Sequence, residues 1–451
     1  MSLPRYPEYK DSGVDWLGKV PAHWQVQPLK SRYAVVGGST PKSDVPEYWD
    51  GDIHWVTPAD LSRLSGFEIR GSLRTITDVG LQTCRTSLVP SGSLILSTRA
   101  PIGSLGLATM EMCTNQGCKA LVPQSGEVSR FAAYTLSIAG SALNVRGKGT
   151  TFLELSGDEL ASFRLAFPER EEQAAIARFL DRETPKIDAL IAEQEKLLAL
   201  LAEKHQVTIS HAVTRGLDPK APMKDSGIPW LGEVPAHWTV AMLRRFVAIF
   251  EQGWSPECES RVPEEGEWGV LKAGCVNGGV FDAAQSKALP SSQQPRPELE
   301  VESGDVLMSR ASGSPKLIGS VAYIVDTPSK LMLSDKIFRL RLSADVDPEF
   351  FSLLMRSQPL RQQIEQAIGG AEGLANNLPQ SSIKDFWLCV PPKSEQRAIV
   401  ESTHTETASL RLLAEAEQRF VDLLKERRSA LISAAVTGQI DVRGEVESAA
   451  A

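Results

Sequence analysis

The sequence has no long apolar run and few cysteines. Its 451 residues are 42% hydrophobic and 23% charged, and no stretch approaches the roughly 18 uncharged apolar residues that a membrane span needs. Residues Met1–Asp15 are polar and lack the apolar segment of a signal peptide, so we expect a cytoplasmic protein. The six cysteines form no CxxC pair, and we expect reduced, mostly buried thiols rather than a metal site.

Motifs of enzymes that act on nucleotides or DNA are missing as well. The closest approach to a phosphate-binding loop is RGKGT at Arg146–Thr150, where glycine replaces the serine or threonine that follows the lysine. We find no Pro-Pro-aromatic methyltransferase motif, no dinucleotide-binding glycine fingerprint, and neither HExxH nor GxSxG. We therefore expect no catalytic residues; a fused methyltransferase or nuclease is the enzymatic alternative.

The sequence also lacks an excess of basic residues. The chain has 48 Lys and Arg against 56 Asp and Glu, a net charge of −8. A protein that binds nucleic acid alone usually carries a basic face, so this balance argues against one. A local cationic patch stays compatible with it, because net charge governs solubility and steering rather than a single site.

The chain is instead a tandem repeat. Lys10–Trp24 (KDSGVDWLGKVPAHW) and Lys224–Trp238 (KDSGIPWLGEVPAHW) share 12 of 15 positions at an offset of 214. A second pair, Pro168–Thr184 and Pro391–Thr407, follows at an offset of 223. Each unit exceeds 200 residues, so the repeat is of whole domains rather than of short solenoid elements.

The repeat predicts a mixed α/β (α+β) fold with two domains and two helical regions. Ser91–Thr109 and Ser303–Ile324 both indicate a strand, a polar Gly/Pro loop and a second strand. The predicted boundaries are a first domain at 1–167, a first spacer helix at 168–215, a second domain at 216–390, a second spacer helix at 391–442 and a disordered tail at 443–451.

Helix-forming residues dominate from Pro168 to Val213. Thr184 before Pro185 is typical of an N-cap followed by proline at the first helical position, so we expect a new helix to start at Pro185 and to extend to Thr214. Because the two halves are similar, we expect a pseudo-two-fold axis that makes the two helices antiparallel. The alternative is a plain dimerisation coiled coil.

Apolar residues recur along both helices at the three- and four-residue spacing of a coiled-coil seam. The first seam is predicted to contain Ile187, Leu190, Gln194, Leu197 and Leu201, and the second Leu410, Leu413, Glu417, Phe420, Leu424 and Leu431. The polar members Gln194 and Glu417 occupy equivalent positions. We expect them to face each other or a partner and to set the register.

Further motifs complete a pattern that is similar to a known family. They are TNQGCKAL (Thr114–Leu121), GTTFLELSGDELASF (Gly149–Phe163) and AVTGQIDVR (Ala435–Arg443). Together with the two boxes, they resemble the specificity subunits of Type I restriction-modification enzymes over nearly the whole chain. The second half departs from the pattern, with SDKIFRL (Ser334–Leu340) and EGLANNLPQSSIKDF (Glu372–Phe386) at the corresponding places.

The resemblance implies a non-catalytic subunit that binds a split double-stranded DNA sequence, one half-site per target-recognition domain. It implies that the helices dock two modification (methyltransferase) subunits, to which restriction (motor-nuclease) subunits are added. No cofactor is expected on this chain. S-adenosylmethionine, ATP and Mg²⁺ belong to the partners. The alternative is a two-domain coiled-coil adaptor that binds proteins instead of DNA.

Loops that combine arginine or lysine with small residues are the best candidates for DNA contact, because their backbones approach phosphates closely. Arg99 and Arg310 are predicted to occupy corresponding places after apolar strands and to read guanine or hold a phosphate. The full set of candidates is Thr98, Arg99, Arg146, Lys148, Thr150, Arg310, Lys316, Asn376 and Asn377.

The box residues are expected to be structural. Trp16, Trp24, Trp230 and Trp238 flank Gly and Pro, and His23 and His237 occupy equivalent places. We interpret them as packing or docking residues rather than as catalytic ones.

Overall fold

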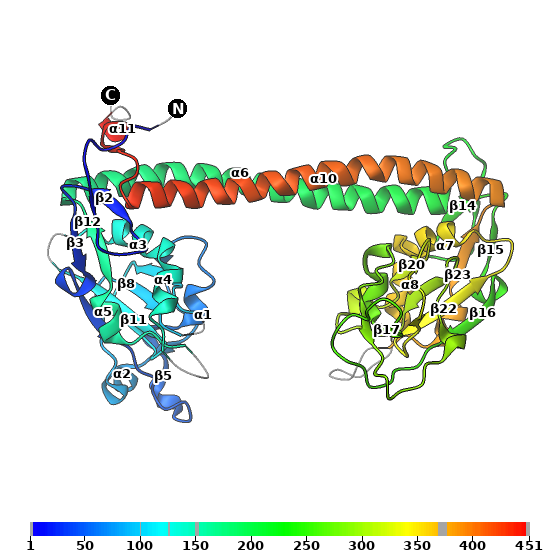
Figure 1. Cartoon of the computed structure of the whole chain (residues 1–451), viewed down its shortest axis with the longest axis horizontal. Coiled ribbons are helices and arrows are strands. Elements are labelled where there is room, and N and C mark those ends of the chain that lie inside the picture. The colour runs from blue at the N-terminus through cyan, green and yellow to red at the C-terminus, as the bar shows by residue number, and fades with distance from the viewer. Residues whose placement is uncertain (1–2, 100, 125–126, 149–152, 369–376, 448–451) are drawn as a thin grey trace. The chain divides into compact units, whose positions relative to one another are not determined.

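The duplicated segments of sequence fold into two equivalent sets of strands and helices (Figure 1). One compact unit contains Met1–Gln194 and Arg419–Ala451, and the other contains Glu195–Gln418. None of the helices in the described part of the chain has the length and apolarity of a membrane span. The computed structural model describes residues 3–99, 101–124, 127–148, 153–368 and 377–447.

The first unit is built on a five-stranded sheet of order β4-β11-β8-β9-β6 and a three-stranded sheet of order β10-β5-β7. Two further pairs, β1-β2 and β3-β12, complete its strands. The strands are β1 (Tyr9–Asp11), β2 (Lys19–Pro21), β3 (Gln25–Pro28), β4 (Tyr33–Gly37), β5 (Trp49–Val56), β6 (Glu68–Ile69), β7 (Thr75–Ile76), β8 (Leu94–Ser97), β9 (Leu105–Ala108), β10 (Cys113–Thr114), β11 (Cys118–Pro123) and β12 (Arg164–Phe167). The short helices are η1 (Leu29–Ser31), η2 (Pro46–Tyr48), α1 (Pro58–Leu61), α2 (Asp78–Cys84), α3 (Ser129–Ile138), α4 (Gly140–Val145) and α5 (Gly157–Ser162).

Local sequence explains these elements. All four residues of β8 are buried, as expected for a strand that is covered on both faces, since α3 lies against β9 and α1 against β8. Thr77 and Ser156 begin α2 and α5 as N-caps, because each side chain accepts a hydrogen bond from a backbone N–H of the first turn.

The second unit repeats this arrangement with one strand fewer in its larger sheet. A four-stranded sheet has the order β16-β22-β19-β20, a three-stranded sheet has the order β18-β17-β21, and the pairs β13-β14 and β15-β23 correspond to β1-β2 and β3-β12. Its strands are β13 (Met223–Asp225), β14 (Glu233–Pro235), β15 (Thr239–Met242), β16 (Val247–Gln252), β17 (Gly269–Leu271), β18 (Ser286–Ala288), β19 (Val306–Ser309), β20 (Val321–Tyr323), β21 (Leu331–Met332), β22 (Ile337–Leu342) and β23 (Trp387–Val390). Its short helices are η3 (Leu243–Arg245), η4 (Ala273–Gly279), η5 (Pro297–Leu299), η6 (Pro315–Leu317), α7 (Pro348–Met355), α8 (Gln358–Ala367) and α9 (Gln380–Lys384). The predicted duplicated mixed α/β fold is confirmed.

The first tryptophan box anchors the start of a long helix. Trp24 is fully buried, and its Nε1 donates a hydrogen bond to Glu172 at 3.0 Å. The Tyr6 hydroxyl donates to the same carboxylate at 2.6 Å, and the His23 Nε2 lies 2.8 Å from it. Glu172 therefore connects three segments of the first unit.

The second box repeats the anchor. Trp238 and His237 contact Glu395 at 3.1 and 2.7 Å, and Glu395 lies 223 residues after Glu172. Trp16 and Trp230 pack against the cores of their own units. The packing role predicted for the tryptophans of the boxes is confirmed, and a docking role stays a prediction.

Two long helices, α6 (Arg170–Arg215) and α10 (Lys393–Val436), fall within the predicted spacer regions. The expected helix start at Pro185 is wrong, because Pro185 lies inside α6. Thr184 is buried and its hydroxyl donates to the Leu180 carbonyl at 2.7 Å, so it is no N-cap. Burial of Ile187 and Leu180 on either side of the proline favours a continuous helix, although proline removes one backbone hydrogen bond.

The helices run antiparallel within each unit (Figure 1). In the first unit, Asp188 of α6 pairs with Arg428 of α10 at 2.6 and 3.1 Å, and the end of α10 packs into the core that contains the start of α6. In the second unit, the end of α6, with Ile209 and Val213, shares a core with Ile399 at the start of α10.

The buried seam differs from the predicted one at several positions. Ile187, Leu201 and Leu424 are buried, and Leu410, Gln194, Glu417 and Leu431 are half-buried. Leu190, Leu197, Leu413 and Phe420 are instead exposed. The buried or half-buried residues beside them are Ile191, Leu198, Ala414 and Val421. Leucine and phenylalanine occur on both the buried and the exposed faces of these helices. Apolarity alone therefore assigned exposed residues to the seam in place of the buried residues beside them. A register role for Gln194 and Glu417 stays a prediction.

The C-terminal segment is ordered further than expected. Arg443–Glu447 form α11 rather than part of a disordered tail, and residues 448–451 lie outside the described part. Arg443 lies over the Tyr6 ring at 5.0 Å, and Arg182 donates to the Glu445 carbonyl at 3.0 Å. These contacts hold α11 against the first unit.

Four of the six cysteines are buried, as predicted. Burial raises the pKa of the thiols of Cys113, Cys118, Cys275 and Cys389 to about 12.

Candidate nucleic-acid interface

Two cationic loops of the first unit meet beyond the C-terminal end of β8. The backbone of Glu154 forms hydrogen bonds with Lys148 in both directions at 3.0 Å. Its carboxylate accepts a hydrogen bond from Arg99 at 2.8 Å, and the next residue, Leu155, donates to the Thr98 carbonyl at 3.0 Å. Arg99 and Lys148 therefore flank the same short segment.

Arg146 belongs to the same cationic loop. Its guanidinium lies over the Phe163 ring at 5.2 Å and donates to Ser162 at 3.3 Å. Lys148 contacts Glu159 at 2.7 Å, and this hydrogen bond holds the pKa of Glu159 below its ordinary value. Arg99 thus pairs with Glu154, whereas Arg146 and Lys148 both lie within 4 Å of Glu159. Thr150 lies outside the described residues.

Thr98 is not available for DNA contact. Its side chain is fully buried, and its hydroxyl donates to the Gly117 carbonyl at 3.2 Å. Successive residues of an extended strand point to opposite faces, so Thr98 points into the core when Arg99 points outward. This corrects the prediction for Thr98.

In the second unit, Arg310 follows β19 and is half-buried. It donates to the Asp335 carbonyl at 3.4 Å, and its own carbonyl accepts from Leu378 at 2.9 Å. Lys316 is exposed on η6. Asn377 is half-buried, and its Oδ1 has no hydrogen-bond partner within the described ranges. Asn376 lies outside them.

Arg310 corresponds to Thr98 rather than to Arg99. Leu155 donates to the Thr98 carbonyl, and Leu378, 223 residues later, donates to the Arg310 carbonyl. The predicted match of Arg99 with Arg310 is therefore wrong by one residue, and the counterpart of Arg99 is Ala311.

Sequence reasoning missed a second group of residues beside Arg310. Lys272, Lys287 and Lys336 line a hollow of about 250 Å³ that includes Ser255. Lys336 lies 3.3 Å from Asp335. Burial would raise the pKa of Asp335, but hydrogen bonds from Ser255 and Lys336 hold it below its ordinary value. The only signal of this group in the sequence is the divergent segment SDKIFRL, which contains Lys336. Lys336 takes the place of Gly117, because the Lys336 carbonyl accepts a hydrogen bond from the Arg310 N–H and the Gly117 carbonyl accepts one from the Thr98 N–H.

The model of one protein family, the Type I restriction modification DNA specificity domain, matches residues 21–199. This part of the chain is therefore similar to the Type I specificity domain. The specificity subunit of the Type I restriction enzyme MjaIX from Methanocaldococcus jannaschii is 35% identical to the chain over 192 residues, 42% of this chain and 43% of that relative. The EcoEI specificity subunit of Escherichia coli is 32% identical over 186 residues, 41% of this chain and 31% of that relative. In these two matches, the chain spans less than half of either relative.

A longer and weaker similarity includes the second unit. The EcoKI specificity subunit of Escherichia coli strain K12 is 21% identical over 401 residues, 85% of this chain and 82% of that relative. A solved chain from a study of complex assembly and conformational transition of the type I R-M system has a TM-score of 0.68 at 14% identity, with 92% of this chain and 98% of that chain covered. At this identity, the structure shows the fold alone. The chain is thus similar in sequence to specificity subunits of Type I restriction enzymes, as its motifs predict.

Proposed function

We propose that the chain is the DNA sequence-recognition subunit of a Type I restriction-modification complex and that each unit binds one half of a split target. The observation that carries this proposal is a shared backbone arrangement with different side chains. The carbonyls of Thr98 and Arg310 accept equivalent hydrogen bonds, while Gly117 of the first unit is replaced by Lys336 of the second. A common scaffold with unlike functional groups suits two unlike half-sites, since base contacts specify and phosphate contacts position.

The helices supply the second part of the proposal, a pair of equivalent docking surfaces for modification subunits. Three exposed apolar residues of α6 recur on α10 at an offset of 223. The exposed fractions are 44% and 45% for Leu190 and Leu413, 36% and 43% for Leu197 and Phe420, and 52% and 60% for Leu200 and Leu423. Several exposed apolar residues on one helix indicate a protein interface. Two equivalent surfaces suit two copies of one partner, and we propose a ratio of two modification subunits to one chain.

In this scheme, the chain is non-catalytic and lies in the cytoplasm with its partners. S-adenosylmethionine, ATP and Mg²⁺ act in the modification and restriction subunits. The partners supply much of the phosphate contact that governs affinity, which reconciles DNA binding with the net charge of −8.

The test is a methylome. The chain is expressed with its modification subunit in a methylation-free bacterial host, and the genome is sequenced with detection of modified bases. We expect two short specified blocks around a fixed unspecified gap, and no such motif when the modification subunit is expressed alone. A continuous motif contradicts the two-domain scheme. Absence of methylation that depends on the chain favours a protein-binding adaptor, and S-adenosylmethionine turnover by the chain alone favours a fused methyltransferase.

A further inference from the structure

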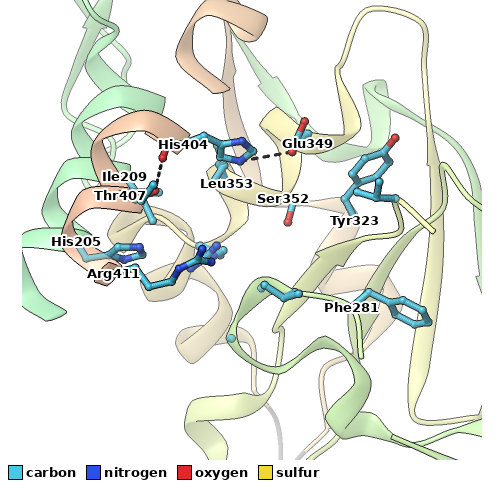
Figure 2. A pocket seen from close by; sticks show the side chains of 16 residues that line it. His205, Ile209, Phe281, Tyr323, Glu349, Ser352, Leu353, His404, Thr407 and Arg411 are labelled. Carbon is cyan, nitrogen blue, oxygen red and sulfur yellow. Dashed lines mark hydrogen bonds and ion pairs between the residues drawn. The ribbon is translucent and has the colours of Figure 1, made fainter. Parts of the chain in front are cut away.

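The second unit contains a cavity of about 590 Å³ that has no role in the scheme above. It lies among α6, α7, α10 and the segment at 278–281, and residues from all four line it (Figure 2). Its charged residues and histidines are His205, Glu349, Arg356, His404 and Arg411. Cations outnumber carboxylates in this lining.

Arg356 is the most confined of these groups. Its guanidinium lies against the backbone of Gly279, where a Cβ atom would be 2.7 Å from Cζ and Nε of the arginine. Burial lowers the pKa of Arg356, and no carboxylate within the described ranges forms an ion pair with it. A half-buried charge without a counter-ion is costly, so this position favours an anion from outside the chain.

Arg411 and His205 reach the same cavity from α10 and α6 (Figure 2). Arg411 has a weak pair with Glu415 of its own helix, at 3.8 Å and with 72% of the arginine side chain exposed. Burial and the charge of Arg356 lower the pKa of His205, which favours a neutral imidazole. The carboxylate in the lining, Glu349, pairs with His404 at 3.5 Å.

The first unit has balanced ion pairs at the equivalent positions. Arg411 and His205 correspond, at the offset of 223, to Asp188 and Arg428, which form a two-contact ion pair. The counterpart of His404 is Asp181, which accepts a hydrogen bond from Arg130 at 2.8 Å.

In the second unit, Arg411 and His404 stand where the first unit has the carboxylates Asp188 and Asp181. Arg356 adds another cation to this lining. The charges at these positions are paired in the first unit, whereas cations outnumber carboxylates in the lining of the cavity in the second.

We propose that this cavity binds the phosphate group of a small ligand, either inorganic phosphate or a nucleotide, between Arg356 and Arg411, with His205 as a neutral hydrogen-bonding group. The planar guanidinium matches phosphate oxygens with two parallel hydrogen bonds. The volume lies in the range of small-molecule sites, and Phe281 and Tyr323 provide aromatic surface on the wall opposite the histidines (Figure 2). The proposal does not depend on DNA recognition by the chain.

The test is calorimetric titration of the full chain with inorganic phosphate, AMP and adenosine at constant ionic strength. We expect phosphate and AMP to bind and adenosine to fail. A higher affinity for AMP identifies a nucleotide as the ligand, and equal affinities identify free phosphate. Arg356→Met should weaken binding by about 10- to 100-fold, as loss of hydrogen bonds from a charged group predicts. Arg397→Met, at an exposed arginine of α10 that does not line the cavity, should bind like the parent.

A second variant separates binding from folding. His205→Asp introduces a carboxylate into the cavity that Arg411 also lines, and it should weaken phosphate binding to a similar extent. The thermal unfolding of His205→Asp and of Arg356→Met should match that of the parent. The proposal is overturned if neither phosphate nor AMP binds, if Arg356→Met binds them like the parent, or if the two variants impair only the binding of duplex DNA.

Discussion

The indole Nε1 of Trp24 donates a hydrogen bond to the carboxylate of Glu172 at 3.0 Å in the interior of the first unit. Trp24 comes from the repeated box and Glu172 from the first turn of α6, 148 residues away. The same carboxylate accepts from the Tyr6 hydroxyl. The box is thus a clamp between the N-terminal segment and the helix.

We expect Glu172→Ala to lower the free energy of unfolding of the first unit by about 2–4 kcal/mol, because two buried donors lose their acceptor. Glu395→Ala should cost the second unit about 1–2 kcal/mol, since Glu395 is more exposed than Glu172. Calorimetric unfolding of the variants measures both effects. Glu171→Ala, at the exposed neighbouring position, is the matched control, and an equal loss in that variant would contradict the clamp.

Arg99→Ala and Arg310→Ala should each impair recognition of one half-site only. Loss of a base or phosphate contact should weaken the binding of target DNA by the assembled complex by about 1–3 kcal/mol. Competition between duplexes in which one half-site at a time is altered gives the readout.

Arg164→Ala is the control for these variants, because Arg164 is exposed on β12 and contacts only the Val26 carbonyl among the described residues. If both loop variants bind the intact site like the parent, the assignment of these loops to DNA fails.

Serine at Leu190 and Leu197 should weaken binding of one modification subunit, and serine at Leu413 and Phe420 should weaken binding of the other. Each exposed apolar side chain that becomes buried at the interface should contribute about 1–2 kcal/mol. Native mass spectrometry of the complex should show loss of one partner copy from each double variant.

Thermal unfolding of these double variants should match that of the parent, because the four side chains are exposed. Val421→Ala, at a buried seam position, should instead reduce stability and leave the stoichiometry unchanged. Full retention of both partners by the double variants would exclude this face as the docking surface.

The duplicated scaffold was predictable because its anchors are repeated residue for residue. Trp24 and Trp238, with Glu172 and Glu395, occupy matching positions in two similar segments. Long helices were also predictable, since residues of high helix propensity fill both regions.

Details that depend on tertiary contacts could not be predicted. Five residues separate Ser97 from Gly103 and nine separate Ser309 from Gly319, so alignment of these loops by composition gave Arg310 the wrong counterpart. The hydrogen bonds of Leu155 and Leu378 establish the correct one.

The sequence could not show which apolar residues of the helices are buried and which are exposed, because the proposed partner surface is as apolar as the buried coiled-coil seam. The cavity beside Arg356 depends on segments more than 100 residues apart, and no local pattern indicates it.

The division of the chain between its units sets an order for folding during synthesis. The second unit is one continuous segment, Glu195–Gln418, whereas the first requires Arg419 and the residues that follow it. Ile432, Val436 and Val442 lie in the core of the first unit. A chain emerging from the ribosome therefore completes the second unit before the last core residues of the first unit have been synthesised. A stalled or truncated product then exposes the apolar surface of the first unit rather than that of the second.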